Sequence, residues 1–566
     1  MKLLNILTIG AVAAGLTLTS CSESFLDVES MTESNTENFY KTETDAYRAL
    51  IGCYAGWRQI ASNPSIGIYI AATVMSDECY GASGNGDGFG YQVVDRFDNS
   101  LSPSDMNLYE GDWQRYYEGI YRCNVLLSYD DQIQWQSEAN RSLYLGECRA
   151  LRALMYFDMA RMFENIPFFL EPSTENREQA DPDEVYAWVL EDLRYAVNNI
   201  PATANHGASD FGRITKQTAE GILARAYMYY TGYYGKQPGW TDEEAGTVGN
   251  VTQQEALAAV EDAISSGYYK LLPKGEFNTL WPAASLVAVP GPAVGWDTDQ
   301  STYAGDANDE VMLAMTFTPG NYNGGNFGNR WQVLIGMRNL WQSPLGRGWG
   351  IGTVCPGYLN FFTNDDQRRS ASVIDIVSEG LTENSLYAAS YKDWREYTGY
   401  CIKKYSPYCY NNTESGGYQN GATADGTADF QIGNTQPWIF LRYADVLLMA
   451  AELGSGNAQS YLDQVRDRAG LGSIPATKEN ILAERARELA FEGHRYWDLL
   501  RQRNGGQVTA LVDALMAVQG PVKNGGLDAT VTYDASKILA TNGLCQIPNN
   551  QITLSNYVLK QNPGWY

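Results

Sequence analysis

Aromatic side chains set among Gly, Asn and Asp residues are the part of this sequence best suited to hold a ligand. The chain contains 39 Tyr and 14 Trp residues but only 2 His. Tyr and Trp rings combine a flat apolar face with a hydrogen-bonding edge, which matches the C–H faces and hydroxyl groups of a sugar ring. The Gly-rich segments 80–98 and 281–349 concentrate such rings, so we predict a carbohydrate-binding platform there. The candidate ligand-binding residues are Trp296, Tyr303, Tyr80, Tyr91, Trp331, Trp341 and Trp349.

Trp296 is the first choice among these candidates because it stands between Gly295 and the acidic Asp297. Most aromatic residues of a large protein pack its core, so each ring taken alone is more often a packing residue than a ligand contact. Loops on a rigid frame commonly carry binding function, and this location favours ligand contact for some members of the group.

Metal-binding patterns are weak in this chain. The stretch Asp297-Thr-Asp299 begins like a calcium loop, but Thr302 and Asn308 stand where such a loop needs Gly and Glu. No His and Cys cluster with zinc spacing occurs. We therefore predict no metal site and no cofactor, with calcium bound by scattered loop oxygens as an open alternative. Among the cysteines, Cys401 and Cys409 are the best candidates for a disulfide.

A dense group of charged side chains at residues 484–501 is the best candidate for catalysis. Charges at i,i+3 and i,i+4 spacings along an amphipathic helix are usually structural pairs, so we predict no catalytic residues. His494 is accordingly interpreted as a helix-packing or capping residue. The group consists of Glu488, Glu492, His494, Arg495 and Asp498.

Residues 1–21 have the composition of an export signal. Lys2 precedes an almost entirely apolar stretch at 3–18, and small residues then lead into Cys21. This stretch is too short and too weakly flanked to serve as a transmembrane helix. Its end resembles a bacterial lipobox, so we predict that residues 1–20 are removed and that Cys21 is the lipidation site, anchoring the protein to a membrane. A secreted protein with a Cys that merely falls at the cleavage site is the alternative.

The net charge restricts the class of partner. The formal charge is −26, and removing residues 1–20 takes away Lys2 and no acid, which leaves −27. A surface this acidic repels phosphate backbones, so nucleic-acid binding is not expected. Polyanionic glycans are disfavoured for the same reason.

Helical periodicity dominates the first half of the chain and returns near the C-terminus. Successive helical hairpins of this kind resemble a tetratricopeptide-type solenoid with irregular spacing. Between them, residues 267–436 are rich in Gly, Asn, Asp, Trp and Tyr, as is typical of long loops. The predicted helices cover residues 45–60, 113–127, 142–163, 181–199, 215–234, 252–266, 437–453, 458–470 and 479–503.

Several motifs in order resemble the SusD/RagB family of outer-membrane nutrient-binding lipoproteins. The strongest is the stretch ERARELAFEGHRYWDLLR at 484–501, which is similar to the hallmark helix of the family. The resemblance covers the whole chain. The other matching segments are Phe25–Val28, Trp113–Asn124, Arg149–Ala153 with Pro167, Gly212–Tyr227, Leu441–Leu448, Val465–Leu471, Ile547-Pro548 and Gln561–Gly564.

The resemblance implies an all-α fold, an irregular solenoid of about four tetratricopeptide-like helix pairs plus a loop-rich ligand-binding region. Residues 21–566 would form a single SusD-like domain, with the paired helices mainly in 44–266 and 437–503 and the loop-rich region at 267–436. It also implies an outward-facing, lipid-anchored location at the cell outer membrane. The implied partner is a SusC-like TonB-dependent barrel transporter, over which the protein acts as a lid that delivers oligosaccharides.

Two other functions stay open on the residues alone. A lipid-anchored glycoside hydrolase needs only two suitably spaced carboxylates, and the chain has 66 Asp and Glu residues. A helical scaffold that binds other proteins is the second alternative. The resemblance favours a protein that is not an enzyme.

Overall fold

A computed structural model describes residues 39–62, 66–285, 302–318, 328–342, 344–412, 417–420, 430–431 and 433–565. The predicted signal peptide, the lipidation site Cys21, the candidate Trp296 and the stretch Asp297–Asp299 lie outside these residues. None of the described helices is both long enough and apolar enough to cross a bilayer.

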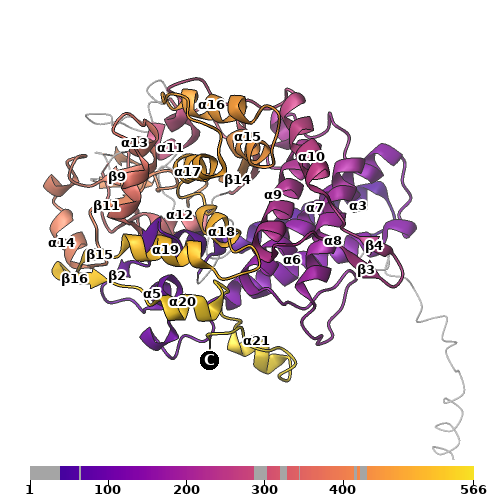
Figure 1. Ribbon diagram of the computed structural model, residues 1–566, viewed down its shortest axis with the longest axis horizontal. Coiled ribbons are helices and arrows are strands. Elements are labelled where there is room, and N and C mark those ends of the chain that lie inside the picture. Colours follow the sequence, from indigo (N-terminus) through magenta and orange to yellow (C-terminus); the bar gives the residue numbers. More distant parts are fainter. Residues whose placement is uncertain are drawn as a thin grey trace, which may run out of the picture.

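The first half of the chain is a series of long helices that pack in chain order. α3 packs against α6, and from α6 to α10 each helix packs against the next one. They form the right-hand half of Figure 1. The predicted helix-rich fold is thereby confirmed, while the four tetratricopeptide-like pairs stay a prediction. These helices are α3 (Glu43–Ser62), α6 (Glu110–Ser128), α7 (Glu138–Phe163), α8 (Pro182–Asn199), α9 (Lys216–Tyr234) and α10 (Gln253–Ser265).

Polar side chains cap α8, α9 and α10 at the residues where the sequence predicts that these helices begin. Asp181 caps α8 by accepting a hydrogen bond from the Asp183 amide at 2.8 Å, and Pro182 occupies the first turn. Thr215 caps α9 and Thr252 caps α10 in the same way. Each cap satisfies an amide of the first turn that has no partner within the helix.

The rest of the chain holds shorter helices, and those labelled in Figure 1 run from the top of the molecule through its centre and left side to the bottom. They are α4 (Ile68–Val74), α5 (Gly90–Arg96), α11 (Pro282–Ser285), α12 (Arg330–Ile335), α13 (Arg368–Ser372), α14 (Tyr387–Lys392), α15 (Tyr443–Glu452), α16 (Ala458–Arg468), α17 (Lys478–Glu488), α18 (Arg495–Leu500), α19 (Thr509–Val518), α20 (Ala535–Thr541) and α21 (Asn549–Leu554).

Small β-sheets join the loop-rich region to the helices, so the all-α prediction is too narrow. One sheet has four strands in the order β1-β8-β11-β9, and the others have two strands each among the described residues. Nearly all pairs are antiparallel. The strands are β1 (Cys79–Tyr80), β2 (Ser83–Gly84), β3 (Trp240–Asp242), β4 (Gly246–Val248), β5 (Val311–Met315), β6 (Met337–Arg338), β7 (Arg347–Gly348), β8 (Thr353–Val354), β9 (Val373–Asp375), β10 (Trp394–Arg395), β11 (Tyr400–Ile402), β12 (Cys409–Asn412), β13 (Gly417–Asn420), β14 (Trp438–Arg442), β15 (Gly520–Asn524) and β16 (Leu527–Val531).

Two predicted helices differ from the structure. Residues 437–453 divide into strand β14, which pairs with β5, and helix α15. Residues 479–503 divide into α17 and α18, because Phe491 and Gly493 adopt positive φ angles of 62° and 77° that end the helical run. A Cβ atom at Gly493 would lie 2.8 Å from the Tyr69 ring, so this turn also requires a residue without a side chain.

A buried cluster of charges binds the loop-rich region to the C-terminal helices. Arg442 donates to Glu310 at 2.7 Å, to Glu488 at 2.6 Å and to Glu492 at 2.8 Å. The cluster contains five acids and five bases, so the formal charges of its members balance. They are Glu310, Asp366, Glu484, Glu488, Glu492, Arg368, Lys404, Arg442, Arg466 and Arg468. Glu488 and Glu492 thus form structural ion pairs, but with bases of other segments and not, as the spacing predicts, with their i,i+3 and i,i+4 neighbours.

Candidate functional site

Residues 337–350 form a loop that is closed at its base. Strand β6 pairs in parallel with β7, so Arg338 lies beside Gly348. The contact between the two ends is tight: a Cβ atom at Gly348 would lie 2.5 Å from the Gly336 Cα and 2.4 Å from the Val333 carbonyl oxygen. Glycine allows this approach, and the closed base holds the loop's side chains in place.

An exposed phenylalanine lies beside this loop. The Phe89 side chain is 44% exposed, and the Arg395 guanidinium packs 4.0 Å from the ring centroid. Arg395 is itself buried and donates to the carbonyl oxygens of Asn85 and Asp87 at 3.0 Å and of Gly88 at 3.1 Å. One arginine therefore fixes the backbone that leads into Phe89 and supports its ring from within, while the remaining ring surface faces solvent.

Polar side chains connect this ring to the closed loop. Arg338 donates to Asp87 at 3.1 Å, to Asp393 at 2.8 Å and to the carbonyl oxygen of Trp349 at 3.3 Å. The exposed Asn339 donates to the same Asp393 oxygen at 3.2 Å. The two carboxylates keep further lone pairs that can accept hydrogen bonds from hydroxyl groups.

The half-buried Trp349 supplies a second ring, with the Arg330 guanidinium 5.1 Å from its centroid. We call the group the Phe89–Trp349 surface. Two rings separated by fixed acids, an amide and an arginine can stack on sugar faces and orient their hydroxyls. The group consists of Asp87, Phe89, Arg338, Asn339, Trp349 and Asp393.

Two further predicted residues, Trp341 within the closed loop and Tyr303 outside it, have partly exposed rings. The Arg347 guanidinium packs between the Trp341 ring at 4.6 Å and the Phe430 ring at 3.9 Å. Tyr303 is half-buried, and its hydroxyl donates to Asp306. Trp341 and Tyr303 therefore have partly exposed rings beside polar groups, as Trp349 has.

Three predicted rings are buried and belong to the core. Tyr80 is 1%, Tyr91 is 7% and Trp331 is 0% exposed. Trp331 packs edge-on against Trp438 at 5.1 Å, and the Tyr80 hydroxyl donates to the Val518 carbonyl oxygen. These three side chains have no free face on which a sugar could stack.

The sequence analysis missed the polar half of the Phe89–Trp349 surface. Arg338 and Asn339 are consecutive, whereas Asp393 lies 55 residues beyond Arg338, and nothing in their local sequence marks them. The pairing of β2 with β10 brings Asp393 next to the Phe89 loop, and this pairing is long-range. Phe89 itself stands in the Gly-rich segment 80–98, where an aromatic ring among glycines indicates a possible binding loop.

The charged group at 484–501 is fully engaged in structural contacts. Burial, together with the nearby Arg225 guanidinium, lowers the pKa of His494 to about 3, so its imidazole is neutral at pH 7. Asp498 accepts from Arg485 and Arg501 at 2.8 Å each, and these guanidinium groups bring its pKa to about 2 against the opposing effect of burial. Glu488, Glu492, Arg495 and Asp498 hold separate segments together through buried ion pairs.

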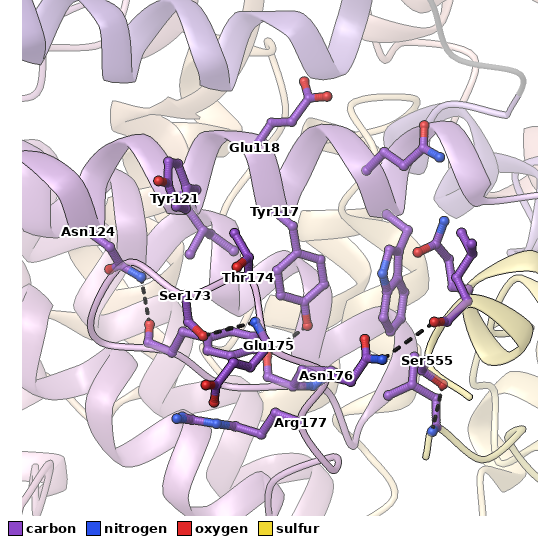
Figure 2. Close-up of a pocket in the computed structure, with 18 of the residues that line it drawn as sticks. Tyr117, Glu118, Tyr121, Asn124, Ser173, Thr174, Glu175, Asn176, Arg177 and Ser555 are labelled. Atoms are coloured by element: carbon purple, nitrogen blue, oxygen red, sulfur yellow. Dashed lines mark hydrogen bonds between the residues drawn. The ribbon is translucent and has the colours of Figure 1, made fainter. Parts of the chain in front are cut away.

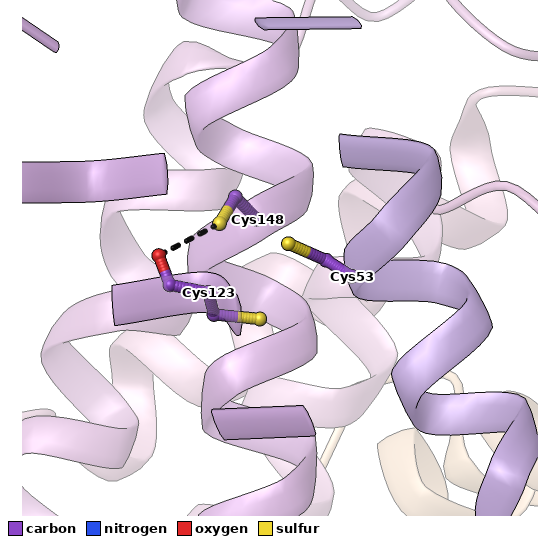
Figure 3. A group of neighbouring side chains, drawn as sticks. All are labelled: Cys53, Cys123 and Cys148. Carbon is purple, nitrogen blue, oxygen red and sulfur yellow. Dashed lines mark hydrogen bonds between the residues drawn. The ribbon is translucent and has the colours of Figure 1, made fainter. Parts of the chain in front are cut away.

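Three cysteines from different helices meet in the core. The thiols of Cys53, Cys123 and Cys148 lie within 4.8 Å of one another, and all three are buried (Figure 3). The Cys148 thiol donates to the Cys123 carbonyl oxygen at 3.5 Å. The predicted Cys401–Cys409 disulfide is wrong, because both are free and the Cys409 thiol donates instead to the Leu345 carbonyl oxygen at 2.8 Å.

Family models match two successive parts of the chain. Residues 25–228 match a model described as starch-binding, associating with outer membrane, and residues 309–565 match the SusD family. The chain belongs to the SusD/RagB family. The match at 309–565 includes the hallmark stretch at 484–501, which in this SusD-family protein forms α17 and α18 rather than one helix.

Relatives of known description agree with this assignment. The chain is 24% identical over 528 residues to SusD-like protein P25 of Formosa agariphila, which covers 85% of this chain and 87% of the relative. A solved laminarin-binding SusD-like protein is 26% identical, with a TM-score of 0.67 and coverage of 93% and 100%. Surface glycan-binding protein A of Bacteroides thetaiotaomicron, solved with laminarihexaose, has a TM-score of 0.69 at 21% identity and the same coverage.

Proposed function

We propose that this SusD-family protein is a non-catalytic surface glycan-binding lipoprotein. It holds neutral oligosaccharides at the Phe89–Trp349 surface and delivers them, as a lid, to a SusC-like TonB-dependent barrel transporter. The observation that carries the proposal is the exposed Phe89 ring, held over the buried Arg395 and bordered by the hydrogen-bonded group of Arg338, Asp87 and Asp393. Relatives described as binding laminarin and laminarihexaose support the substrate class.

The anchor and location belong to the same proposal. Lipidated Cys21 would hold residues 21–566, as one SusD-like domain with tetratricopeptide-like helix pairs, on the outward face of the outer membrane. The family description of the N-terminal part, which mentions association with the outer membrane, supports this location. A lipid-anchored lid can open and close over a transporter without leaving the membrane surface.

Binding is tested by calorimetric titration of the mature chain with laminarihexaose and other neutral hexasaccharides. A Phe side chain has about 200 Å² of surface, of which the exposed 44% is about 90 Å². A sugar covering half of this area contributes about 1 kcal/mol, and ring stacking adds about as much. Together these contributions come to about 2 kcal/mol, so Phe89→Ala should weaken binding about thirtyfold.

The matched control is Tyr268→Ala, which removes a ring that is 40% exposed and lies far from this surface in sequence. The Tyr268 ring stacks on His206 with the centroids 3.6 Å apart. This variant should bind as the parent does. Equal affinity of parent and Phe89→Ala for every sugar that binds the parent would refute this location of the site.

The same mixtures separate binding from hydrolysis. A glycoside hydrolase needs one carboxyl group that donates a proton, whereas Asp87 and Asp393 both accept hydrogen bonds from Arg338. We expect bound sugar without new reducing ends after prolonged incubation. Release of reducing ends that depends on either Asp would replace the proposal with the hydrolase alternative.

The transporter partnership needs its own test in the native membrane. Mild detergent extraction followed by affinity purification of the tagged lipoprotein should retain one barrel protein in constant proportion. A Cys21→Ala variant, which has no lipid anchor, should lose surface retention while the purified chain still binds sugar. Recovery of no barrel protein with the anchored form would contradict the proposed partnership.

A further inference from the structure

A groove with a volume of about 730 Å³ lies beside the long helix α6, apart from the Phe89–Trp349 surface. It lies between α6, the segment 167–177 and the chain that runs from α21 to Leu559 (Figure 2). Its volume is in the range of sites that bind small molecules, roughly 300–1,000 Å³. None of its lining residues belongs to the Phe89–Trp349 surface.

One wall of the groove is a row of aromatic rings on α6. Trp113, Tyr117 and Tyr121 follow one another at intervals of four residues, which places them on one face about 6 Å apart along the helix. Trp113 is buried, Tyr117 is half-buried and Tyr121 is 44% exposed, so the rings lead from the floor to the rim. Phe169 faces them, with its centroid 6.5 Å from that of Tyr117.

The opposite wall, residues 167–171, is held by hydrogen bonds to its backbone. Tyr117 donates to the carbonyl oxygen of Pro167 at 2.7 Å, and Asn124 to that of Phe169 at 2.9 Å. The carbonyl oxygens of Phe168, Leu170 and Glu171 likewise accept from side chains. Five consecutive carbonyl groups therefore each accept a side-chain hydrogen bond, which fixes the backbone of this wall.

The rim of the groove carries groups that recognise hydroxyls. The carboxylates of Glu118, Glu171 and Glu175 are exposed, and Thr174 and Asn176 lie beside them (Figure 2). Three acids disfavour an anionic ligand.

The two arginines of the lining already have partners within the protein. Arg122 donates to the carbonyl oxygen of Gly52 at 3.1 Å, and Arg177 to that of Phe168 at 2.7 Å. The lining therefore combines ring faces with three acids, an amide, a hydroxyl and two arginines, whose remaining N–H groups can donate to sugar hydroxyls.

We infer that this groove binds a segment of a neutral oligosaccharide, as a second contact site apart from the Phe89–Trp349 surface. A sugar ring stacks on Tyr121, its neighbour reaches towards Tyr117, and the rim acids accept hydrogen bonds from the hydroxyl groups. Two sites on one chain let a long glycan be held at two points, which slows its release.

The test is calorimetric titration of the mature chain with laminarihexaose, maltohexaose and mannohexaose. For a sugar that binds, we expect two events per chain. Tyr121→Ala should weaken one event at least fivefold, Phe89→Ala should weaken the other, and the double variant should lose both. The matched control is Tyr47→Ala, a 39% exposed tyrosine on α3 outside the groove, which should leave both events unchanged. Circular dichroism and a fall in Tm identify any variant that fails to fold. Tyr121→Phe keeps the ring and should restore the binding that Tyr121→Ala loses.

Other results would overturn the inference. A single event that Phe89→Ala weakens and Tyr121→Ala does not touch removes the second site and leaves the proposed function intact. A single event sensitive only to Tyr121→Ala would instead support binding in the groove and overturn the Phe89 site of the proposed function. Binding of a lysine-rich peptide, but of none of the three sugars, in a manner that depends on Tyr121 would show that the acidic groove recognises cationic chains.

Discussion

Replacing Arg442 by Met should strongly destabilise the protein, because it removes one cation from the buried charge cluster. Glu492 would keep only Lys404 as a charged partner, and Glu310 would keep only Arg468. The cluster would then hold five acids against four bases with almost no contact to water. Breaking a buried ion pair by removing one partner typically costs about 3–5 kcal/mol, since the other charge stays buried and uncompensated.

The assay is thermal unfolding at a fixed scan rate, because a chain of this size need not unfold in two states. The control is Arg48→Met, which removes an exposed arginine 3.7 Å from Asp45 and should change stability by less than about 1 kcal/mol. The double variant Arg442→Met/Glu492→Leu restores the balance of charge and should recover part of the loss. If Arg442→Met and Arg48→Met had the same Tm, the cluster would not stabilise the fold as described.

Three further predictions concern pH, thiols and the closed loop. The folded chain keeps His494 neutral down to about pH 3, whereas the unfolded chain protonates it near pH 6.5, so the stability of the fold should fall as pH drops below 6.5. His494→Gln should flatten this fall, as measured by thermal unfolding between pH 6.5 and 5. The eight cysteines among the described residues are free and buried, so with Cys21 acylated as proposed a thiol reagent should find none in the folded chain and eight after unfolding, whereas a count of six would reveal a disulfide. Gly348→Ala, which forces the loop base apart, should weaken sugar binding in the same titration, and unchanged binding would contradict a role for the closed base.

The sequence predicted the long helices because their signals are local. The cap at Asp181 with Pro182, and the apolar stripes of α3, α6 and α7, depend only on neighbours along the chain. Residues 437–453 are apolar on every side, so periodicity alone cannot separate the strand that pairs with β5 from the helix that follows it. The break in 479–503 has one local signal, Gly493, which can adopt the positive φ angle that ends the helical run.

The candidate site was predictable in its kind but not in most of its members. Rings in Gly-rich segments indicate a glycan surface, and Trp341, Trp349 and Tyr303 are partly exposed as that requires. Composition could not show that Trp331 packs against Trp438, because burial depends on distant segments. Arg338 and Asp393 are 55 residues apart, and only the fold places them in one ion pair.

A crystal structure of the mature chain with a bound neutral hexasaccharide tests the location and the chemistry of the site most directly. We predict electron density for a sugar ring stacked on the exposed face of Phe89, with hydroxyl groups within hydrogen-bond distance of Asp87, Asp393 or Asn339. Density for a bound sugar that touches neither Phe89 nor Trp349 would contradict the proposed binding surface.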